Sequence, residues 1–145
     1  MDGTIANLYA VQGWLHMLET HNPAPYIQCA PMWDMSELAR VLTALQRKGI
    51  EIRIITWLAK DATIAYDNEV RLAKREWLAR YKFPFDHFHA IKYGVTKANS
   101  VRKYLVENET AILIDDNAEV RKGWHLGDTL NPTECDIINE LRKLL

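Results

Sequence analysis

Apolar and polar residues follow two spacings along the chain, one typical of helices and one typical of buried strands. Four segments are predicted to be helices: 36–48, 62–81, 97–108 and 136–145. Three short apolar runs are predicted to be strands: 51–56, 88–92 and 111–114. Asp34 or Ser36 is the expected N-cap of the first helix, and Gly49 is expected to end it. The second helix has an expected apolar face of six residues: Ile64, Val70, Leu72, Ala73, Trp77 and Leu78.

The order of these elements predicts the fold class. Strands that alternate with helices are joined by right-handed crossovers, which build a parallel sheet with helices on both faces. We therefore expect an α/β fold with a mostly parallel sheet. The length of 145 residues favours a single domain, 1–145.

Residues 8–35 do not fit this alternation. They contain Trp14, Tyr26, Trp33 and three prolines, and they are too long for a tight turn. We expect a helix followed by an irregular loop that lies over one end of the sheet. The aromatic residues either pack on the surface or form a small cap or lid, and the sequence leaves both interpretations open.

Polar residues stand where strands of such a sheet would end. They are residues 2–4, Thr56 and residues 115–116, and Lys97 begins the helix that follows the strand 88–92. In an open parallel sheet, ligands bind beyond the carboxyl ends of the strands, so these side chains are expected at one edge. Carboxylates with open coordination positions suit Mg²⁺, and a hydroxyl with an ammonium group can hold a phosphoryl group. The pattern predicts a magnesium and phosphate site.

Each of these residues also has a purely structural interpretation. The two aspartates, with Asn117, could cap the following helix. A pair of adjacent acids after a buried strand is costly without a counter-ion, however, which favours a metal site. Thr56 alone would be a strand-end residue, and Lys97 alone would be a solvated lysine, with Lys92 as a competitor for its role. Order and spacing together, rather than any single residue, indicate the site.

In chain order, the segments MDGTIANLY, IRIITW, TKANSV and AILIDDN resemble the motif series of haloacid dehalogenase-like phosphatases. That family carries an apolar strand ending in DxDGT, a strand ending in Thr or Ser, a Lys near the start of a helix, and a strand ending in two acids. The resemblance covers nearly the whole chain, and the opening and small size also resemble 5′-nucleotidase (deoxyribonucleotidase) relatives. It implies a Rossmann-like three-layer sandwich and Mg²⁺-dependent hydrolysis of a small phosphorylated metabolite or nucleotide through an aspartyl-phosphate.

The resemblance also implies roles for the matching residues. Asp2 matches the general acid/base of the family, which also offers its backbone carbonyl to Mg²⁺. Thr56 matches the hydroxyl that binds phosphate. Lys97 matches the lysine that steadies nucleophile and phosphate, with Lys92 in reserve.

The remaining matches concern the metal and the first turn. Asp115 matches a direct metal ligand, and Asp116 matches a direct or water-mediated one. Gly3 and Thr4 match the turn beyond the nucleophile strand and join Thr56 in the expected phosphate-binding set.

The nucleophilic aspartate of the family has no counterpart in the sequence. It lies two residues before the position of Asp2, and the sequence begins at Met1. A fragment or a wrong start site is the expected explanation, and an inactive relative or a strand from another subunit are the alternatives. Without that carboxylate we expect negligible phosphatase activity from the 145 residues, because Asp2 is placed to move protons and not to attack.

Two other function classes compete with a phosphohydrolase. An inactive member of the family would bind phosphate or a nucleotide as a regulatory protein. A receiver domain of a signalling relay also groups acids, a Thr and a Lys at one sheet edge. Its acid pair follows the first strand, however, whereas here the pair follows the strand 111–114, which counts against this class.

The composition narrows the partners. Hydrophobic residues make up 48% of the chain and charged residues 26%, which is ordinary for a globular protein. The net charge of −1 gives no general attraction to nucleic acid or anionic membranes, so any phosphate recognition is expected to be local. We find no apolar run long enough for a transmembrane helix and no secretory signal. Cys29 and Cys135 are expected to be unpaired thiols, and the chain is expected in the cytoplasm.

Two further groups are expected to have no role in binding. A basic stretch of the helix 62–81, diluted by two glutamates, is predicted to be a solvated helix face: Arg71, Lys74, Arg75 and Arg80. His87 and His89 alternate as on a strand, but no third ligand stands nearby, so edge histidines are expected rather than a metal pair.

Overall fold

The computed structural model describes residues 1–145. Its α-helices are α1 (Trp14–Glu19), α2 (Ala24–Gln28), α3 (Met35–Arg47), α4 (Ile64–Arg80), α5 (Lys97–Val101), α6 (Ala118–Lys122) and α7 (Ile137–Arg142). Two 3₁₀-helices are η1 (Leu8–Ala10) and η2 (Arg102–Tyr104). The strands are β1 (Arg53–Trp57), β2 (His87–Ile91), β3 (Leu113–Ile114) and β4 (Thr129–Leu130).

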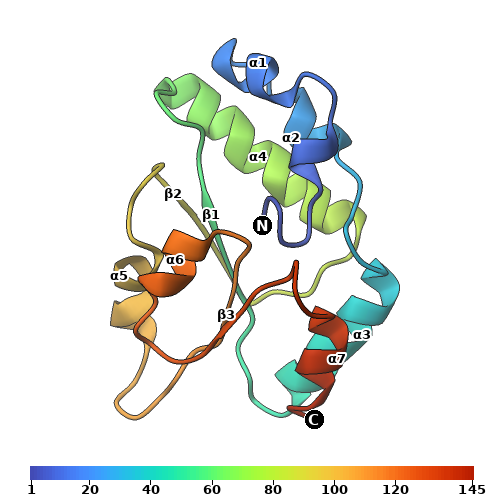
Figure 1. Ribbon diagram of the computed structural model, residues 1–145, viewed down its shortest axis with the longest axis vertical. Helices are drawn as coiled ribbons and strands as arrows, with labels where there is room; N and C mark the ends of the chain where they lie inside the picture. Colours follow the sequence, from blue (N-terminus) through green and yellow to red (C-terminus); the bar gives the residue numbers. More distant parts are fainter.

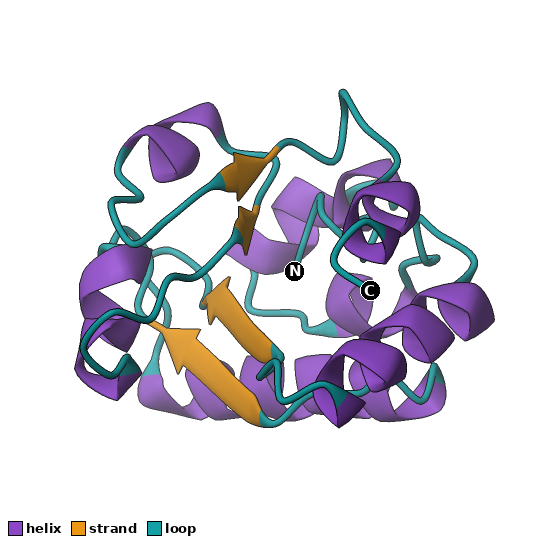
Figure 2. Ribbon diagram, turned by 90° about the horizontal axis from the view of Figure 1, so that it is seen from below, coloured by secondary structure: helices purple, strands orange, loops and turns teal.

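The strands form two small parallel sheets. β1 pairs with β2, with Thr56 opposite Ala90, and β3 pairs with β4, with Ile114 opposite Leu130. Helices and loops surround both pairs (Figure 2). The predicted α/β class is therefore confirmed at the level of a mixed α/β chain with parallel strand pairs.

Helices α1, α2 and α4 form one group and α3 and α7 another, towards opposite ends of the molecule, while α5 and α6 lie to one side (Figure 1). At one end, α2 packs on α4 and α1 packs on α2; at the other, α3 packs on α7. The main core packs the first residues of the chain against α3, α4, α7 and β1. Its side chains include Met1, Ile5, Leu38 and Trp77. The beginning of the chain is thus buried between elements that are distant in sequence.

Helix α3 follows the expected pattern. Asp34 is its N-cap and accepts hydrogen bonds from the backbone N–H groups of Ser36 and Glu37, both at 3.0 Å. Its four predicted apolar positions are all buried: Leu38, Val41, Leu42 and Leu45. The chain turns away at Gly49, whose φ of +86° is accessible to glycine without strain.

Helix α4 departs from its expected apolar face. Val70, Ala73, Trp77 and Leu78 are buried as predicted. The prediction was wrong for Ile64 and Leu72, which are 82% and 58% exposed. The helix turns a narrower face to the core than the apolar residues alone suggest.

The C-terminal half has shorter elements than predicted. The helix expected over 97–108 ends at Val101 and continues as η2. The strand expected over 111–114 contains only Leu113 and Ile114. The backbone N–H groups of residues 111, 113 and 115 nevertheless donate to the carbonyls of residues 126, 128 and 130, along the same ladder. The pattern did not predict three short elements: α2, α6 and β4.

None of the helices combines the length and apolar character that crossing a bilayer requires. Cys29 is buried and Cys135 is partly exposed, both as free thiols.

Candidate functional site

One cavity of about 610 Å³ is lined by residues from each of the three expected strand ends: Asp2, Thr56 and the pair Asp115 and Asp116. Its polar wall contains six residues from these positions and their neighbours: Asp2, Thr56, Lys97, Asp115, Asp116 and Asn117. Gly3 and Thr4 are buried directly after Asp2. The structure therefore brings Asp2, Thr56, Lys97, Asp115 and Asp116 to one cavity, whereas Gly3 and Thr4 do not line it.

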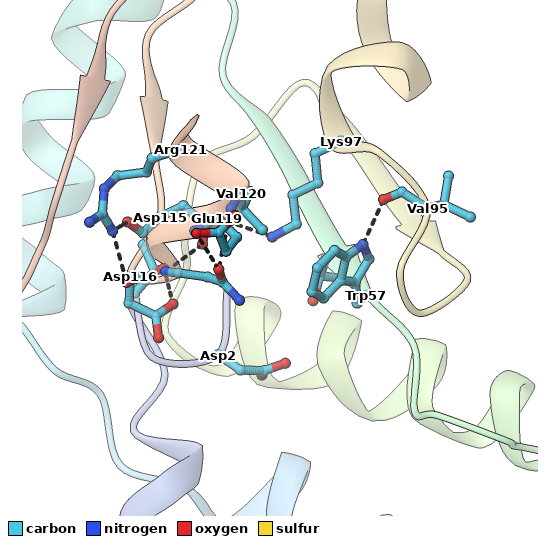
Figure 3. Close-up of polar contacts among 12 residues, drawn as sticks. Asp2, Trp57, Val95, Lys97, Asp115, Asp116, Glu119, Val120 and Arg121 are labelled. Carbon is cyan, nitrogen blue, oxygen red and sulfur yellow. Dashed lines mark hydrogen bonds and ion pairs between the residues drawn. The ribbon is translucent and has the colours of Figure 1, made fainter. Parts of the chain in front are cut away.

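Lys97 and Asp115 form a buried ion pair in the wall of this cavity (Figure 3). Lys97 Nζ lies 2.6 Å from Asp115 Oδ2, and the two side chains are 8% and 5% exposed. The other carboxylate oxygen of Asp115 accepts the backbone N–H of Asn117 at 2.9 Å. Lys97 Nζ also lies 5.2 Å from the ring centroid of Trp57. Lys92 is exposed and does not line the cavity. Of the two candidate lysines, only Lys97 lies in the cavity wall.

Among the three aspartates of the predicted site, Asp116 is the one that makes no ion pair within the protein. No Lys, Arg or His forms an ion pair with it. Arg121 lies close but donates to the backbone carbonyls of Asp115 and Asp116, both at 2.8 Å (Figure 3). The pKa of Asp116 is raised, first by burial and then by the charge of Asp115. A bound cation would relieve this unfavourable charge.

The first turn of the chain lies against Asp116. Thr4 Oγ1 donates to Asp116 Oδ1 over a long 3.4 Å. Gly3 has φ +69°, and a Cβ at this position would lie 2.3 Å from Asp116 Oδ2. Only glycine combines this backbone conformation with room for the carboxylate.

Lys74 is a site residue that the sequence analysis missed. Its ammonium group donates to Asp2 Oδ2 at 2.7 Å, to Thr56 Oγ1 at 2.6 Å and to the carbonyl of Trp57 at 2.8 Å. The side chain is completely buried, so its assignment to a solvated helix face was wrong. The signal was present in the spacing, because Lys74 falls between Ala73 and Trp77 on the buried side of α4.

The site thus holds two lysine clusters, the Lys74 cluster (Lys74, Asp2 and Thr56) and the Lys97 cluster (Lys97, Asp115 and Asp116). Comparison with models of known protein families, with curated proteins and with solved structures found no match for this chain. What the site can do therefore follows from its own residues.

The donors available to a metal are oxygen atoms. No three His, Cys, Asp or Glu side chains are grouped so that they alone could hold an ion. Two of the three predicted acids, Asp2 and Asp115, are already paired with lysines. Asp116, with its unneutralised charge, is the acid that fits a cation, and an oxygen-only environment suits a hard ion such as Mg²⁺.

The two histidines of β2 lie away from this cavity. The rings of His87 and His89 are 6.2 Å apart, and His89 Nε2 lies 3.3 Å from Arg53 Nη1. Burial lowers the pKa of His89, and the nearby Arg53 adds to this effect. The positive charge of Arg53 beside His89 disfavours binding of a metal cation at these two histidines.

Residues 8–35 pack against α4 and line part of the cavity. Tyr26 of α2 is buried, and α4 holds the segment through hydrogen bonds from Tyr66 to the carbonyl of Asn22 and from Trp77 to that of Cys29. Aromatic and apolar side chains from this segment line the cavity: Leu8, Tyr9, Trp14, Leu15, Leu18 and Tyr26. Leu8 and Tyr26 are also core residues, so the segment joins core packing to a wall of the site.

Proposed function

We propose that this chain is a cytoplasmic, haloacid dehalogenase-like, Mg²⁺-dependent phosphohydrolase that acts on a small phosphomonoester. The single observation that carries the proposal is the convergence of Asp2, Thr56, Lys97 and Asp115 on one cavity. These residues come from four distant parts of the sequence, in the order of the family's motifs. A solvated or purely structural set would have no reason to meet at one cavity.

We extend the proposal to the fold, a Rossmann-like three-layer sandwich. β1 and β3 each pair with one strand only, so each has a free edge. Ile54 of β1 belongs to the same core cluster as Met1 and Ile5, and Ile114 of β3 packs against that cluster. A strand ahead of Met1, lying between β1 and β3, would join the two pairs into one parallel sheet.

The same strand would carry the nucleophilic aspartate into the site. The backbone nitrogen of Met1 is fully buried, and burial followed by the charge of Lys97 lowers the pKa of this α-amino group to about 6. A residue attached there would lie among Lys97, Lys74 and Asp115, whose charges all act on this nitrogen. A carboxylate next to Lys97 would be well stabilised.

The chemistry then divides among the residues of the cavity. The upstream carboxylate attacks phosphorus, the ester P–O bond breaks, and the leaving oxygen takes a proton from the Asp2 carboxyl group. Water then attacks the phosphorus of the aspartyl-phosphate and gives a proton to Asp2, while the bond between phosphorus and the aspartyl oxygen breaks, which releases inorganic phosphate and returns the upstream carboxylate. Thr56 and Lys97 hold the phosphoryl oxygens throughout. Mg²⁺, held by Asp116, would neutralise the charge that develops on those oxygens.

The test is an extension of the chain by an apolar strand that ends in Asp directly before Met1, assayed with p-nitrophenyl phosphate. We expect Mg²⁺-dependent hydrolysis from this protein and none from the 145 residues alone. The matched control carries the same strand ending in Asn, which removes only the nucleophile and should be inactive. An inactive Asp form would count against the phosphohydrolase.

A second candidate is a phosphate- or nucleotide-binding regulatory protein without turnover. The aromatic lining of the cavity favours this candidate. The ring centroids of Tyr9 and Trp14 are 5.0 Å apart, and those of Trp57 and Tyr93 are 5.1 Å apart. Such rings suit the flat base of a nucleotide. Isothermal titration with Mg²⁺ and a nucleotide, run beside a turnover assay of the Asp form, separates the candidates. Binding without product would favour the regulatory protein.

A further inference from the structure

Lys74 is fully used by the protein itself. An ammonium group has three N–H donors and no acceptor, and Lys74 gives one to each of three oxygens: Asp2 Oδ2, Thr56 Oγ1 and the carbonyl of Trp57. The side chain is 0% exposed, does not line the cavity, and lies 4.8 Å from the ring centroid of Tyr26. Lys74 therefore has no donor left for a ligand.

These bonds decide how Thr56 faces the cavity. Because the ammonium group can only donate, Thr56 Oγ1 is the acceptor, and the hydroxyl hydrogen remains free. Thr56 donates to no other protein group, and it lines the cavity. Lys74 thereby leaves the hydroxyl hydrogen of Thr56 available to an anion that enters the cavity.

Asp2 is fixed by the same ammonium group. Its Oδ2 is bound to Lys74, while Oδ1 has no hydrogen-bond partner in the protein. The side chain extends towards the side of the cavity that holds Lys97 and Trp57 (Figure 3). Lys74 neutralises the charge of this carboxylate, so that an incoming anion does not meet an unpaired negative charge.

We infer that Lys74 is a positioning residue, which orients the Thr56 hydroxyl as a hydrogen-bond donor and compensates the charge of Asp2 so that the cavity binds a phosphate group. The inference rests on the proposed function for the identity of the anion. It gives the two lysines separate tasks, since Lys97 lines the cavity and can touch the ligand, whereas Lys74 acts only through its neighbours.

The test is a titration of the 145-residue chain with inorganic phosphate in the presence of Mg²⁺, followed by NMR. We expect Lys74→Met to weaken phosphate binding by roughly tenfold, because the Thr56 hydroxyl loses its orientation and the charge of Asp2 loses its compensation. Thr56→Val should weaken it by a similar factor, and Thr56→Ser should keep it. Because Lys74 acts partly through the Thr56 hydroxyl and partly through the charge of Asp2, the double variant Lys74→Met/Thr56→Val should lose less affinity than the product of the two single losses.

The matched control is Lys143→Met. Lys143 also makes a 2.7 Å ion pair, with Glu140, but on the surface and away from the cavity, so its loss should leave phosphate binding unchanged. Circular dichroism checks that each variant is folded. The ¹⁵N signal of the Lys74 ammonium group gives a measurement that does not require Lys74→Met to fold. Thr56→Val should shift this signal, because it removes the oxygen that Lys74 binds. In the unmutated chain, the hydrogen bond from Lys74 to Thr56 should persist when phosphate is added.

The outcomes separate the inference from the function on which it rests. If the unmutated chain does not bind phosphate, the inference falls, and the proposed function is judged by the hydrolysis assay of the extended Asp form. If the unmutated chain binds phosphate and a folded Lys74→Met binds equally well, only the inference falls. Fully multiplicative losses in the double variant, or a Lys74 ammonium group that leaves Thr56 for phosphate, would also overturn it.

Discussion

The Lys74 cluster and the Lys97 cluster face the same cavity but differ in how their charges are satisfied. In the first, one lysine serves one carboxylate and two neutral oxygens, and no donor remains. In the second, one lysine serves Asp115, while Asp116 keeps an unneutralised charge. A closed cluster fixes geometry, whereas a cluster with surplus charge leaves a place for a ligand.

The largest effect is expected where the closed cluster is broken. Lys74→Met leaves the partly buried carboxylate of Asp2 without its partner, which should lower the free energy of unfolding by about 3 kcal/mol. Lys97→Met should cost less, because Asp115 retains the N–H of Asn117. Urea denaturation measures both losses, with Lys143→Met as the exposed control that should change little. Equal losses in Lys74→Met and Lys143→Met would remove the distinction between closed and exposed pairs.

The next effect concerns the turn that lies against the surplus charge. Gly3→Ala places a Cβ 2.3 Å from Asp116 Oδ2 at a φ of +69°, and should cost about 3 kcal/mol through strain and crowding together. Gly49→Ala is the matched control, because φ is +86° there but nothing lies within 4 Å of the added Cβ. It should cost only the conformational part, about 1 kcal/mol. Thermal unfolding of both variants isolates the contact with Asp116, and equal costs would show that this contact is unimportant.

Sequence patterns could predict which residues meet, because strand ends and the residue order carry that information. Thr56 and Asp115 follow apolar runs, and parallel pairing brings such ends to one edge. The role of Lys74 was harder to predict, since composition treats a lysine among arginines as solvated, and only the helical spacing places it on the buried side. The strand β4 could not be predicted, because its two residues gain their place from the backbone ladder with β3 and not from their own side chains.

A smaller effect tests whether the surplus charge binds a cation. Mg²⁺ at ten times its dissociation constant should stabilise the unmutated chain by about 1.4 kcal/mol, and Asp116→Asn should lose this gain. Asp61→Asn is the control, because Asp61 is an exposed acid that lines the same cavity. Calorimetric melting with and without Mg²⁺ measures the difference. Equal protection of both variants would mean that Mg²⁺ acts on general surface charge and not on Asp116.

The smallest effect is the pH dependence of the same charge without Mg²⁺. The pKa of Asp116 is raised above its ordinary 3.8, so between these two pKa values the folded state holds a proton that the unfolded chain has lost. This group therefore favours folding as the pH falls and opposes folding as the pH rises through the raised pKa, the reverse of a carboxylate that is paired with a lysine. Asp116→Asn should be the more stable protein at pH 7, and its advantage should disappear as the pH approaches 3.8. Urea denaturation of the two proteins across this range measures the gap, and a gap that stays constant with pH would show that Asp116 carries no surplus charge in the folded state.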